Sequence, residues 1–413
     1  MRALWISDYF PRPHDPTTGV WAFETVRGLQ RQGCDVEVLA PTPWIPRAAA
    51  WSTALRRWAS VPPAYQLMGV PVHAPRCLHY PHRLVERHLY RRWPQLDTEL
   101  VWQGCRPAVE SLLRRARFDV VHANFVFPAG YLGWRIKQAY RIPMVIHERS
   151  PLRLAAAMSR PARQALYTRL VREANALITL NGHLAAQLQR VGRQPVHVIP
   201  AGADPASASA AEAPRPERYA ASVVVLCVGA FIPRKGHDML LRAVERLRPS
   251  QLNLHVILIG GGPQRRAVER QIAQRGLEGC VEVWGRRPPR EVLAAMSWCD
   301  IFALPSWDEA FGTVYAEAMA CGRPIVACRG EGIEDVVSDG SQGLLVPARD
   351  AEALAGALGR LAADAELRRA MGEAARQLAH SRLTYDVIAR TILAIYETLP
   401  SAGALHAHLS DLC

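Results

Sequence analysis

Two successive sets of alternating strand-like and helix-like segments constrain the fold of this 413-residue chain more than any other feature. In the first set, short apolar runs alternate with amphipathic stretches such as 20–32 and 162–175. This alternation favours a parallel, doubly wound α/β sheet. The strands expected in the first set are 3–7, 35–39, 70–74, 120–123, 144–147, 176–180 and 196–199.

A second set of the same kind begins at residue 223, after a stretch at 201–222 that is rich in Ala, Pro and Ser and reads as a linker. Its expected strands are 223–228, 255–259, 281–284, 301–304, 325–327 and 344–346, and its expected helices lie near 238–247, 264–275, 290–296 and 351–361. A chain of this length is expected to form two domains. We place them at 1–203, with 384–413 added, and at 204–383.

The last periodic segment predicts an amphipathic helix, because its apolar residues recur on one helical face. These residues are Tyr385, Ile388, Ala389, Ile392, Leu393, Tyr396 and Leu399.

The stretch 306–321 carries two carboxylates, Glu309 and Glu317, with seven residues between them. A short apolar run ending at Pro305 precedes them, and Gly312 followed by good helix formers indicates a strand-to-helix turn. A helix start of this kind can bind a phosphate, whereas carboxylates accept hydrogen bonds from hydroxyl groups. A pair of surface glutamates is the simpler alternative, but phosphate, ribose and sugar together indicate a nucleotide sugar.

The residues that follow this pair carry a family resemblance. Gly322-Arg323-Pro324 is followed by the expected strand 325–327, and the whole pattern resembles glycosyltransferase family 4. That family contains retaining transferases, including those of bacterial exopolysaccharide, capsule and teichuronic acid assembly. The resemblance implies the GT-B fold, in which two Rossmann-like domains face a central cleft and a C-terminal helix crosses back to the first domain.

The resemblance also implies which residues do the chemistry. Lys235 and Arg234, beside two glycines, are expected to bind the diphosphate and, with Glu309, to be catalytic. The family usually carries an arginine where this chain has Ala230, so Arg234 is expected to supply the missing charge. Asn124 is expected to complete the catalytic set. It stands where the family often has a second histidine that contacts the donor sugar, and asparagine cannot titrate.

The same family resemblance implies further contacts with the donor. Glu317 is expected to hold the ribose hydroxyls, and Glu309 is expected to face the sugar with backbone amides around it. The expected donor-binding set is Gly19, Glu317, Phe311, Gly312, Thr313, Arg286 and Gly262. The segment 330–335 resembles a glycine-rich family segment and is read as structural support. His122, His147 and Arg149 follow or end strands of the first domain and are expected to line the acceptor site.

No metal or cofactor is expected. The sequence has no D-x-D motif, no metal-ligand cluster and no dinucleotide fingerprint, and its nine cysteines are scattered, which favours free thiols in a reducing cytosol. No apolar run approaches the roughly 20 residues that a membrane-spanning helix needs. We expect a cytoplasmic enzyme.

The net charge of +13 indicates an anionic partner, and no nucleic-acid-binding motif is present. Tryptophans and arginines gather within 41–117, which suits a peripheral site on an anionic membrane surface. A buried core with a solvated arginine face is the alternative. The residues are Trp44, Trp51, Trp58, Trp93 and Trp102, with Arg47, Arg56, Arg57, Arg76, Arg83, Arg87, Arg91, Arg92, Arg114, Arg115 and Arg117.

The leading function is therefore transfer of a sugar from a UDP- or GDP-sugar to a cell-envelope glycan or a lipid-linked saccharide. Two alternatives remain open from the residues. One is a transferase that makes a soluble glycoside or glucan, and the other is a non-catalytic peripheral membrane protein on a transferase fold. The substitutions at Ala230 and Asn124 are what keep the non-catalytic alternative open.

Overall fold

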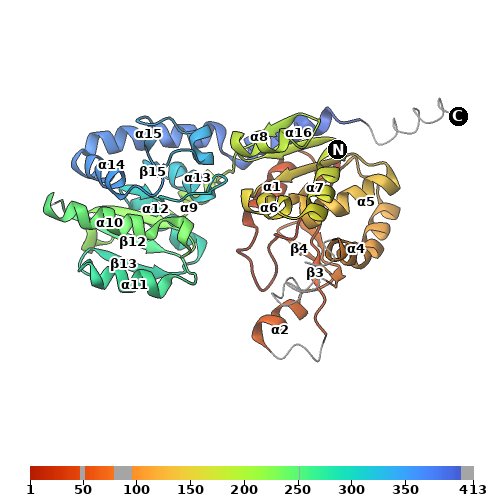
Figure 1. The fold of residues 1–413 in the computed structure, drawn as a ribbon, viewed down its shortest axis with the longest axis horizontal. Helices are drawn as coiled ribbons and strands as arrows, with labels where there is room; N and C mark the ends of the chain where they lie inside the picture. Colours follow the sequence, from red (N-terminus) through yellow and green to blue (C-terminus); the bar gives the residue numbers. More distant parts are fainter. Residues whose placement is uncertain (47–51, 79–94, 251, 401–413) are drawn as a thin grey trace. The chain divides into compact units, whose positions relative to one another are not determined.

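The computed structural model describes residues 1–46, 52–78, 95–250 and 252–400. The chain forms two compact units, which we call unit 1 and unit 2. Unit 1 contains residues 1–199 and 388–413, and unit 2 contains residues 200–387. The divisions therefore fall four residues from the expected ones on both sides. Figure 1 shows the elements of each unit.

Unit 1 is built on an eight-stranded sheet with the order β10-β9-β8-β7-β1-β2-β5-β4. All neighbours in it run parallel except β4 and β5, which are antiparallel. The strands are β1 Arg2–Ile6, β2 Asp35–Leu39, β4 Ala64–Leu67, β5 Val70–His73, β7 Val120–Asn124, β8 Met144–Glu148, β9 Ala176–Thr179 and β10 Val196–Val198. A separate two-stranded parallel pair joins β3 Thr42–Pro43 to β6 Arg76–Cys77.

The helices of unit 1 lie mostly between its strands, as the alternation predicts. They are α1 Val20–Arg31, α2 Thr53–Ala59, α4 Leu96–Arg115, α5 Tyr131–Tyr140, α6 Pro151–Met158, α7 Pro161–Glu173 and α8 Gly182–Gln189. Helix α4 was not predicted from the sequence, although acidic residues in its first turn and arginines in its last turn are typical of a helix.

Unit 2 has a six-stranded, fully parallel sheet with the order β13-β12-β11-β14-β15-β16. Its strands are β11 Val223–Val228, β12 Leu254–Ile259, β13 Val281–Gly285, β14 Ile301–Ala303, β15 Ile325–Cys328 and β16 Gly343–Val346. Its helices are α9 Pro205–Ala210, α10 His237–Leu247, α11 Arg265–Gln274, α12 Pro289–Trp298, α13 Thr313–Ala320, α14 Ala351–Ala363 and α15 Ala365–Arg382. Within the unit, α10 packs against α14 and α13 packs against α15.

The expected linker at 201–222 is wrong, because this stretch is folded into unit 2. Asp204 caps α9 by accepting hydrogen bonds from the first backbone amides of the helix. Tyr219 is buried and stacks on Trp298, with ring centroids 5.5 Å apart. Arg215 forms an ion pair with Asp300 at 2.9 Å. The Ala-, Pro- and Ser-rich composition of this stretch does not reveal that these residues anchor it in unit 2.

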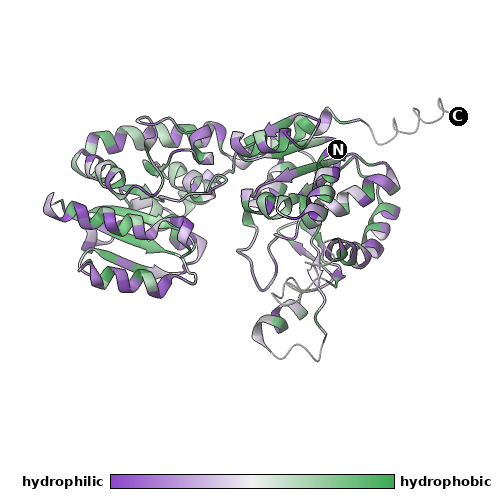
Figure 2. Cartoon of the chain, in the orientation of Figure 1, coloured by the Kyte–Doolittle hydropathy of each residue, from purple (hydrophilic) through white to green (hydrophobic). Residues whose placement is uncertain are grey.

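The last helix, α16 Tyr385–Glu397, joins unit 1 from residue 388 onward, which confirms the predicted return of a C-terminal helix to the first domain. The hydroxyl of Tyr396 lies 2.7 Å from Nδ1 of His122 on β7, and both side chains are buried. Figure 2 shows apolar residues concentrated on the strands of both units. The apolar side chains of the strands therefore form the buried cores that stabilise the two sheets.

Candidate functional site

Three loops of unit 2 meet at the carboxyl ends of β11, β14 and β15, which are neighbours in the sheet. The backbone amide of Trp307 donates to the carbonyl of Arg234 at 2.9 Å, which joins the first loop to the second. The amide of Gly332 donates to the carbonyl of Glu309 at 3.2 Å, which joins the third loop to the second. In parallel sheets, ligands bind at this edge.

The predicted residues Lys235, Arg234 and Glu309 are brought together here. The Lys235 ammonium contacts Oε2 of Glu309, and Nη1 of Arg234 lies 3.2 Å from the same oxygen. The side chains of Lys235 and Glu309 are each 12 % exposed, and that of Arg234 is 29 % exposed. The cluster thus places two cations and one carboxylate together in the loops that follow β11 and β14.

Two glycines allow the backbones to approach at this edge. A Cβ on Gly236 would lie 2.1 Å from the carbonyl oxygen of Pro305, which no side chain can occupy. Gly312 has a φ of 79°, in the left-handed region that favours glycine, and it precedes α13. Within the described residues no side chain caps this helix start, which leaves its first amides available to a ligand, and the preceding Phe311 is fully buried.

Glu317 lies in the second turn of α13, and its carboxylate has no hydrogen-bond or ion-pair partner within the described ranges. Burial raises the pKa of Glu317 to about 7. A half-buried carboxyl without a partner is suited to accept hydrogen bonds from a ligand. Glu317 therefore has both the chemistry and the free acceptor atoms that ribose recognition needs.

Gly262 and Arg286 lie at the ends of the neighbouring strands β12 and β13. Gly262 has a φ of 157°, and a Cβ there would lie 2.6 Å from the carbonyl oxygen of Phe231. The Arg286 side chain passes close to Gly261, where a Cβ would lie 2.7 Å from Nε of Arg286. Both predicted donor residues are thus placed along the same sheet edge as the Lys235 cluster.

In unit 1, the predicted polar residues lie on one face of the sheet near its carboxyl edge. Trp5 is in register with His122, and Asn124 is in register with His147. The His122 ring stacks on Trp5 with centroids 3.9 Å apart. The side-chain oxygen and nitrogen of Asn124, Nε2 of His122 and Nδ1 of His147 are buried without a partner in the described part of the chain.

Neither histidine is available as a cation in this environment. Burial lowers the pKa of His122 to about 3 and lowers that of His147 well below its ordinary value, and Arg149 adds repulsion in both cases. His122 is fully buried, and its Nδ1 is bonded to the hydroxyl of Tyr396. Nε2 of His147 lies 3.2 Å from the Arg149 guanidinium.

Arg149 lies at the end of β8, where its guanidinium stacks on Trp21 of α1 at 3.9 Å from the ring centroid. Gly19 precedes α1 with a φ of 77°, and a Cβ there would lie 2.4 Å from the carbonyl oxygen of Tyr9. The loop after β1 is therefore closed tightly against the helix start. Arg149 and Gly19 consequently share the carboxyl edge of the unit 1 sheet.

Two residues that shape these sites were not predicted from the sequence. Glu331 accepts backbone hydrogen bonds from Asp308 and Glu309, although its segment was read only as general support. Glu148 is buried at the end of β8 and accepts the amides of Val126, Arg149 and Ser150. In both cases the partner is a backbone amide of another loop or of the next residues, which no motif encodes.

The tryptophan-rich region of unit 1 divides into surface and core. Trp44 is 45 % exposed, whereas Trp102 is buried and its ring lies beneath Arg135. For Trp102 the alternative of a buried core is therefore confirmed, and the membrane-surface interpretation is wrong. Trp58 of α2 contacts Arg12, whose guanidinium lies 4.7 Å from the ring centroid. Trp51, Trp93, Arg47, Arg83, Arg87, Arg91 and Arg92 lie outside the described residues.

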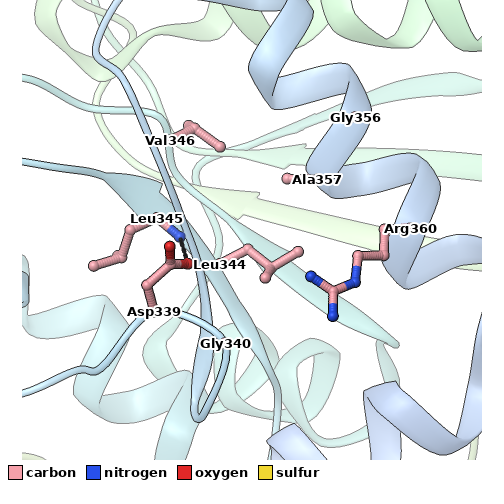
Figure 3. A pocket seen from close by; sticks show the side chains of 8 residues that line it. All are labelled: Asp339, Gly340, Leu344, Leu345, Val346, Gly356, Ala357 and Arg360. Atoms are coloured by element: carbon pink, nitrogen blue, oxygen red, sulfur yellow. Dashed lines mark hydrogen bonds between the residues drawn. The ribbon is translucent and has the colours of Figure 1, made fainter.

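A hollow of about 450 Å³ lies elsewhere in unit 2, between β16 and α14 (Figure 3). It contains none of the predicted site residues, and its charged lining residues are Asp339 and Arg360. Within the described ranges, no cluster of three or more His, Cys, Asp or Glu side chains is arranged to hold a metal ion. Among the helices that the structure describes, none has the length and hydropathy required to cross a bilayer.

Comparison with known families agrees with this geometry. Residues 18–207 match the family described as Glycosyltransferase Family 4, and residues 211–378 match Glycosyl transferases group 1. A D-inositol 3-phosphate glycosyltransferase from Corynebacterium jeikeium is 33% identical over 310 residues, which is 69% of this chain and 74% of that protein. The corresponding enzyme of Xylanimonas cellulosilytica is 30% identical over 91% of this chain and 90% of its own length.

A GDP-mannose-dependent alpha-(1-6)-phosphatidylinositol monomannoside mannosyltransferase from Mycolicibacterium smegmatis is 37% identical over 38% of this chain and 43% of that protein. Among solved structures, sucrose-phosphate synthase from Thermosynechococcus elongatus superposes with a TM-score of 0.74 at 21% identity, covering 96% of this chain and 98% of that chain. Anabaena HepE in complex with UDP-glucose gives 0.69 at 20% identity, covering 97% and 100%. These structural likenesses confirm the predicted GT-B fold.

Proposed function

Because this chain belongs to the group 1, family 4 glycosyltransferases, we propose that it transfers a sugar from a UDP- or GDP-sugar to a phosphate-bearing acceptor of the cell envelope. The acceptor class, the retention of anomeric configuration and the independence from metal are parts of this proposal. The cluster of Lys235, Arg234 and Glu309 at the ends of β11 and β14 is the observation that carries it.

The donor side of the reaction requires stabilisation of a departing nucleoside diphosphate. Lys235 and Arg234 supply two positive charges, and the uncapped amides at the start of α13 supply further donors near Gly312 and Thr313. Fixed charges in a partly buried site stabilise developing negative charge without reorganisation. These groups can stabilise the charge of the diphosphate in place of a metal ion, which supports the proposal of metal-independent transfer.

Glu317 is assigned to the ribose, since its carboxylate has free acceptor atoms on the helix that also offers the phosphate-binding amides. Gly262 and Arg286 are assigned to the nucleotide because they lie at the adjoining strand ends. Glu309 is assigned to the transferred sugar. Gly19 and Asn124 of unit 1 keep the donor-related roles that the family resemblance implies.

The acceptor is assigned to unit 1. The relatives named above act on a phosphorylated inositol and on a phosphatidylinositol mannoside, so both acceptors carry phosphate. Arg149 stands at the carboxyl edge of the unit 1 sheet with its guanidinium over the Trp21 ring, and His147 lies beside it. A guanidinium fixed in this way suits phosphate recognition.

A lipid-linked acceptor would require contact with a membrane surface. Residues 38–85 contain no Asp or Glu, and they include the exposed Arg56 and Arg57 of α2. Trp44 and Leu78 are both largely exposed, and the amide of Trp44 donates to the carbonyl of Cys77, next to Leu78. A cationic surface with exposed apolar side chains supports peripheral binding to anionic lipid at the inner face of the cytoplasmic membrane.

Calorimetric titration with UDP and GDP, followed by a hydrolysis screen of their sugar conjugates in EDTA, tests the donor assignment. We expect micromolar binding of one nucleotide and slow release of its sugar without metal. Binding of neither nucleotide would support the non-catalytic alternative. Identification of the anomer in which the sugar is first released tests the retaining mechanism. An anomer of inverted configuration would overturn it.

Acceptor class is tested separately, by supplying the donor with free inositol phosphate, neutral disaccharides or vesicles containing phosphatidylinositol. We expect transfer to phosphate-bearing acceptors and vesicle sedimentation that weakens with salt. Transfer to neutral sugars alone, without vesicle binding, would favour the soluble-glycoside alternative. An Arg56→Ala, Arg57→Ala double variant should lower vesicle binding while leaving donor hydrolysis unchanged.

A further inference from the structure

The carboxylate of Glu331 connects two loops of the candidate donor site. Glu331 follows β15, and its Oε1 accepts the backbone amide of Asp308 at 3.0 Å. Its Oε2 accepts the amide of Glu309 at 2.7 Å. The neighbouring amide of Gly332 donates in return to the carbonyl of Glu309 at 3.2 Å. Three hydrogen bonds therefore fix the loop that carries Glu309 to the loop after β15.

The backbone held by these bonds is in an unusual conformation. Asp308 has a φ of 54°, in the left-handed region that residues with a side chain rarely occupy. Such a conformation persists only where surrounding contacts determine it. At Asp308 the contacts are the amide accepted by Glu331 and the carbonyl that accepts from Nη1 of Arg234 at 3.4 Å.

A carboxylate is electrostatically costly at this position. Burial raises the pKa of Glu331, and the nearby charges of Asp308 and Glu309 raise it further, whereas the two accepted amides lower it. Both of its oxygens are occupied by the amides of Asp308 and Glu309. The hydrogen bonds of the Glu331 carboxylate are therefore made to the backbone that carries the Glu309 side chain.

We propose that Glu331 is a positioning residue, which holds the backbone of Asp308 and Glu309 so that the Glu309 carboxylate is directed at Lys235 and Arg234. This inference rests on the proposed function, because it assigns Glu331 a role in the same donor site. Glu331 acts through Glu309 and does not itself touch the substrate. Loss of its carboxylate releases two amides and lets Glu309 leave the two cations.

Steady-state kinetics of donor turnover test this role in Glu331→Gln and Glu331→Ala variants. Glutamine keeps one accepting oxygen, so we expect kcat to fall about 10-fold in Glu331→Gln and up to about 100-fold in Glu331→Ala. The donor KM should change by less than about 3-fold, since the diphosphate and ribose contacts remain. Glu334→Gln is the matched control, because Glu334 accepts the amide of Gly330 in the same segment and should leave kcat near wild type.

A double-mutant cycle separates positioning from a purely structural role. If Glu331 acts through Glu309, Glu331→Gln should cost less than about 2-fold when it is made in Glu309→Gln protein. The full 10-fold cost in that background, or wild-type kcat with only a lowered Tm, would overturn the proposal. Glu331→Gln keeps the size and shape of the side chain, so it remains informative should the alanine variant fail to fold.

Crystal structures of wild-type and Glu331→Gln protein supply a readout that does not depend on turnover. We expect the Glu309 carboxylate to leave Lys235 in the variant, and an unchanged contact would contradict the inference. Absence of donor binding and hydrolysis in the wild type would instead count against the proposed function. The two failures are therefore distinguishable.

Discussion

Lys235 and Arg234 share a single oxygen of Glu309. The Lys235 ammonium contacts Oε2, and Nη1 of Arg234 lies 3.2 Å from it. A donor diphosphate that binds these cations would therefore share them with Glu309. The carboxylate would keep its other oxygen, Oε1, to accept hydrogen bonds from the sugar.

Lys235→Ala should lower kcat for donor turnover by about 10²-fold to 10³-fold, because the variant loses a fixed charge beside the departing diphosphate. The chain has one other lysine, Lys137, whose ammonium donates to the carbonyl of Glu173 in unit 1. Lys137→Ala is therefore the matched control and should retain near-normal kcat. A wild-type rate in Lys235→Ala would remove Lys235 from the proposed mechanism.

Arg234→Ala should weaken nucleoside diphosphate binding about 10-fold, since a charge-assisted contact is lost. The second substitution Ala230→Arg in this variant should restore much of the affinity, because Ala230 occupies the position where the family usually has its arginine. Calorimetric titration of the single and double variants measures both effects. If Ala230→Arg restores nothing, the idea that the charge has moved from position 230 to Arg234 is wrong.

Nucleotide binding should release protons near pH 7. Burial raises the pKa of Glu317 to about 7, and ribose hydroxyls that donate to the ionised carboxylate lower it on binding. At pH 7 the bound state therefore holds fewer protons, by up to about half a proton, and affinity should rise between about pH 6 and 8 before it levels off. Calorimetry in buffers of different ionisation enthalpy measures the release.

Glu317→Gln is the control for this effect, because glutamine does not titrate. The variant should bind more weakly, with no pH-dependent proton release from this position. Equal proton release in the variant and the wild type would assign the titration to another group and sink the ribose assignment.

Tyr396→Phe should destabilise unit 1 by about 1–3 kcal/mol, because it leaves Nδ1 of His122 buried without a partner. Tyr140→Phe on α5 is the control, since Tyr140 is 39 % exposed and its substitution should cost less than about 0.5 kcal/mol. Urea unfolding followed by tryptophan fluorescence measures the difference. Equal stability of the two variants would show that this contact contributes nothing to the docking of α16.

Local pattern was enough to predict most of the fold. The bounds of β2 and β11 agree with the expected strands, because β11 is an unbroken apolar run and β2 alternates polar with apolar residues. The start of α13 after Gly312 follows from the need for positive φ at that turn. The same local logic brought Lys235, Arg234 and Glu309 to neighbouring strand ends.

Long-range partners could not be predicted in this way. His122 and Tyr396 are 274 residues apart, so neither sequence neighbourhood indicates the other. Glu331 binds backbone amides, which every residue except proline possesses, and its choice of Asp308 and Glu309 depends on the paths of two loops. Trp102 illustrates the same limit, because tryptophan and arginine can lie at a surface or, as here, in a core beneath Arg135.

The discontinuous make-up of unit 1 has a consequence for synthesis on the ribosome. Residues 1–199 emerge first, but residues 388 onward complete the same unit, and unit 2 lies between them in the chain. A nascent chain therefore holds β7 without the helix that supplies Tyr396 until all of unit 2 has been translated. A message truncated anywhere within unit 2 therefore yields a unit 1 that lacks α16 and leaves His122 without its Tyr396 partner.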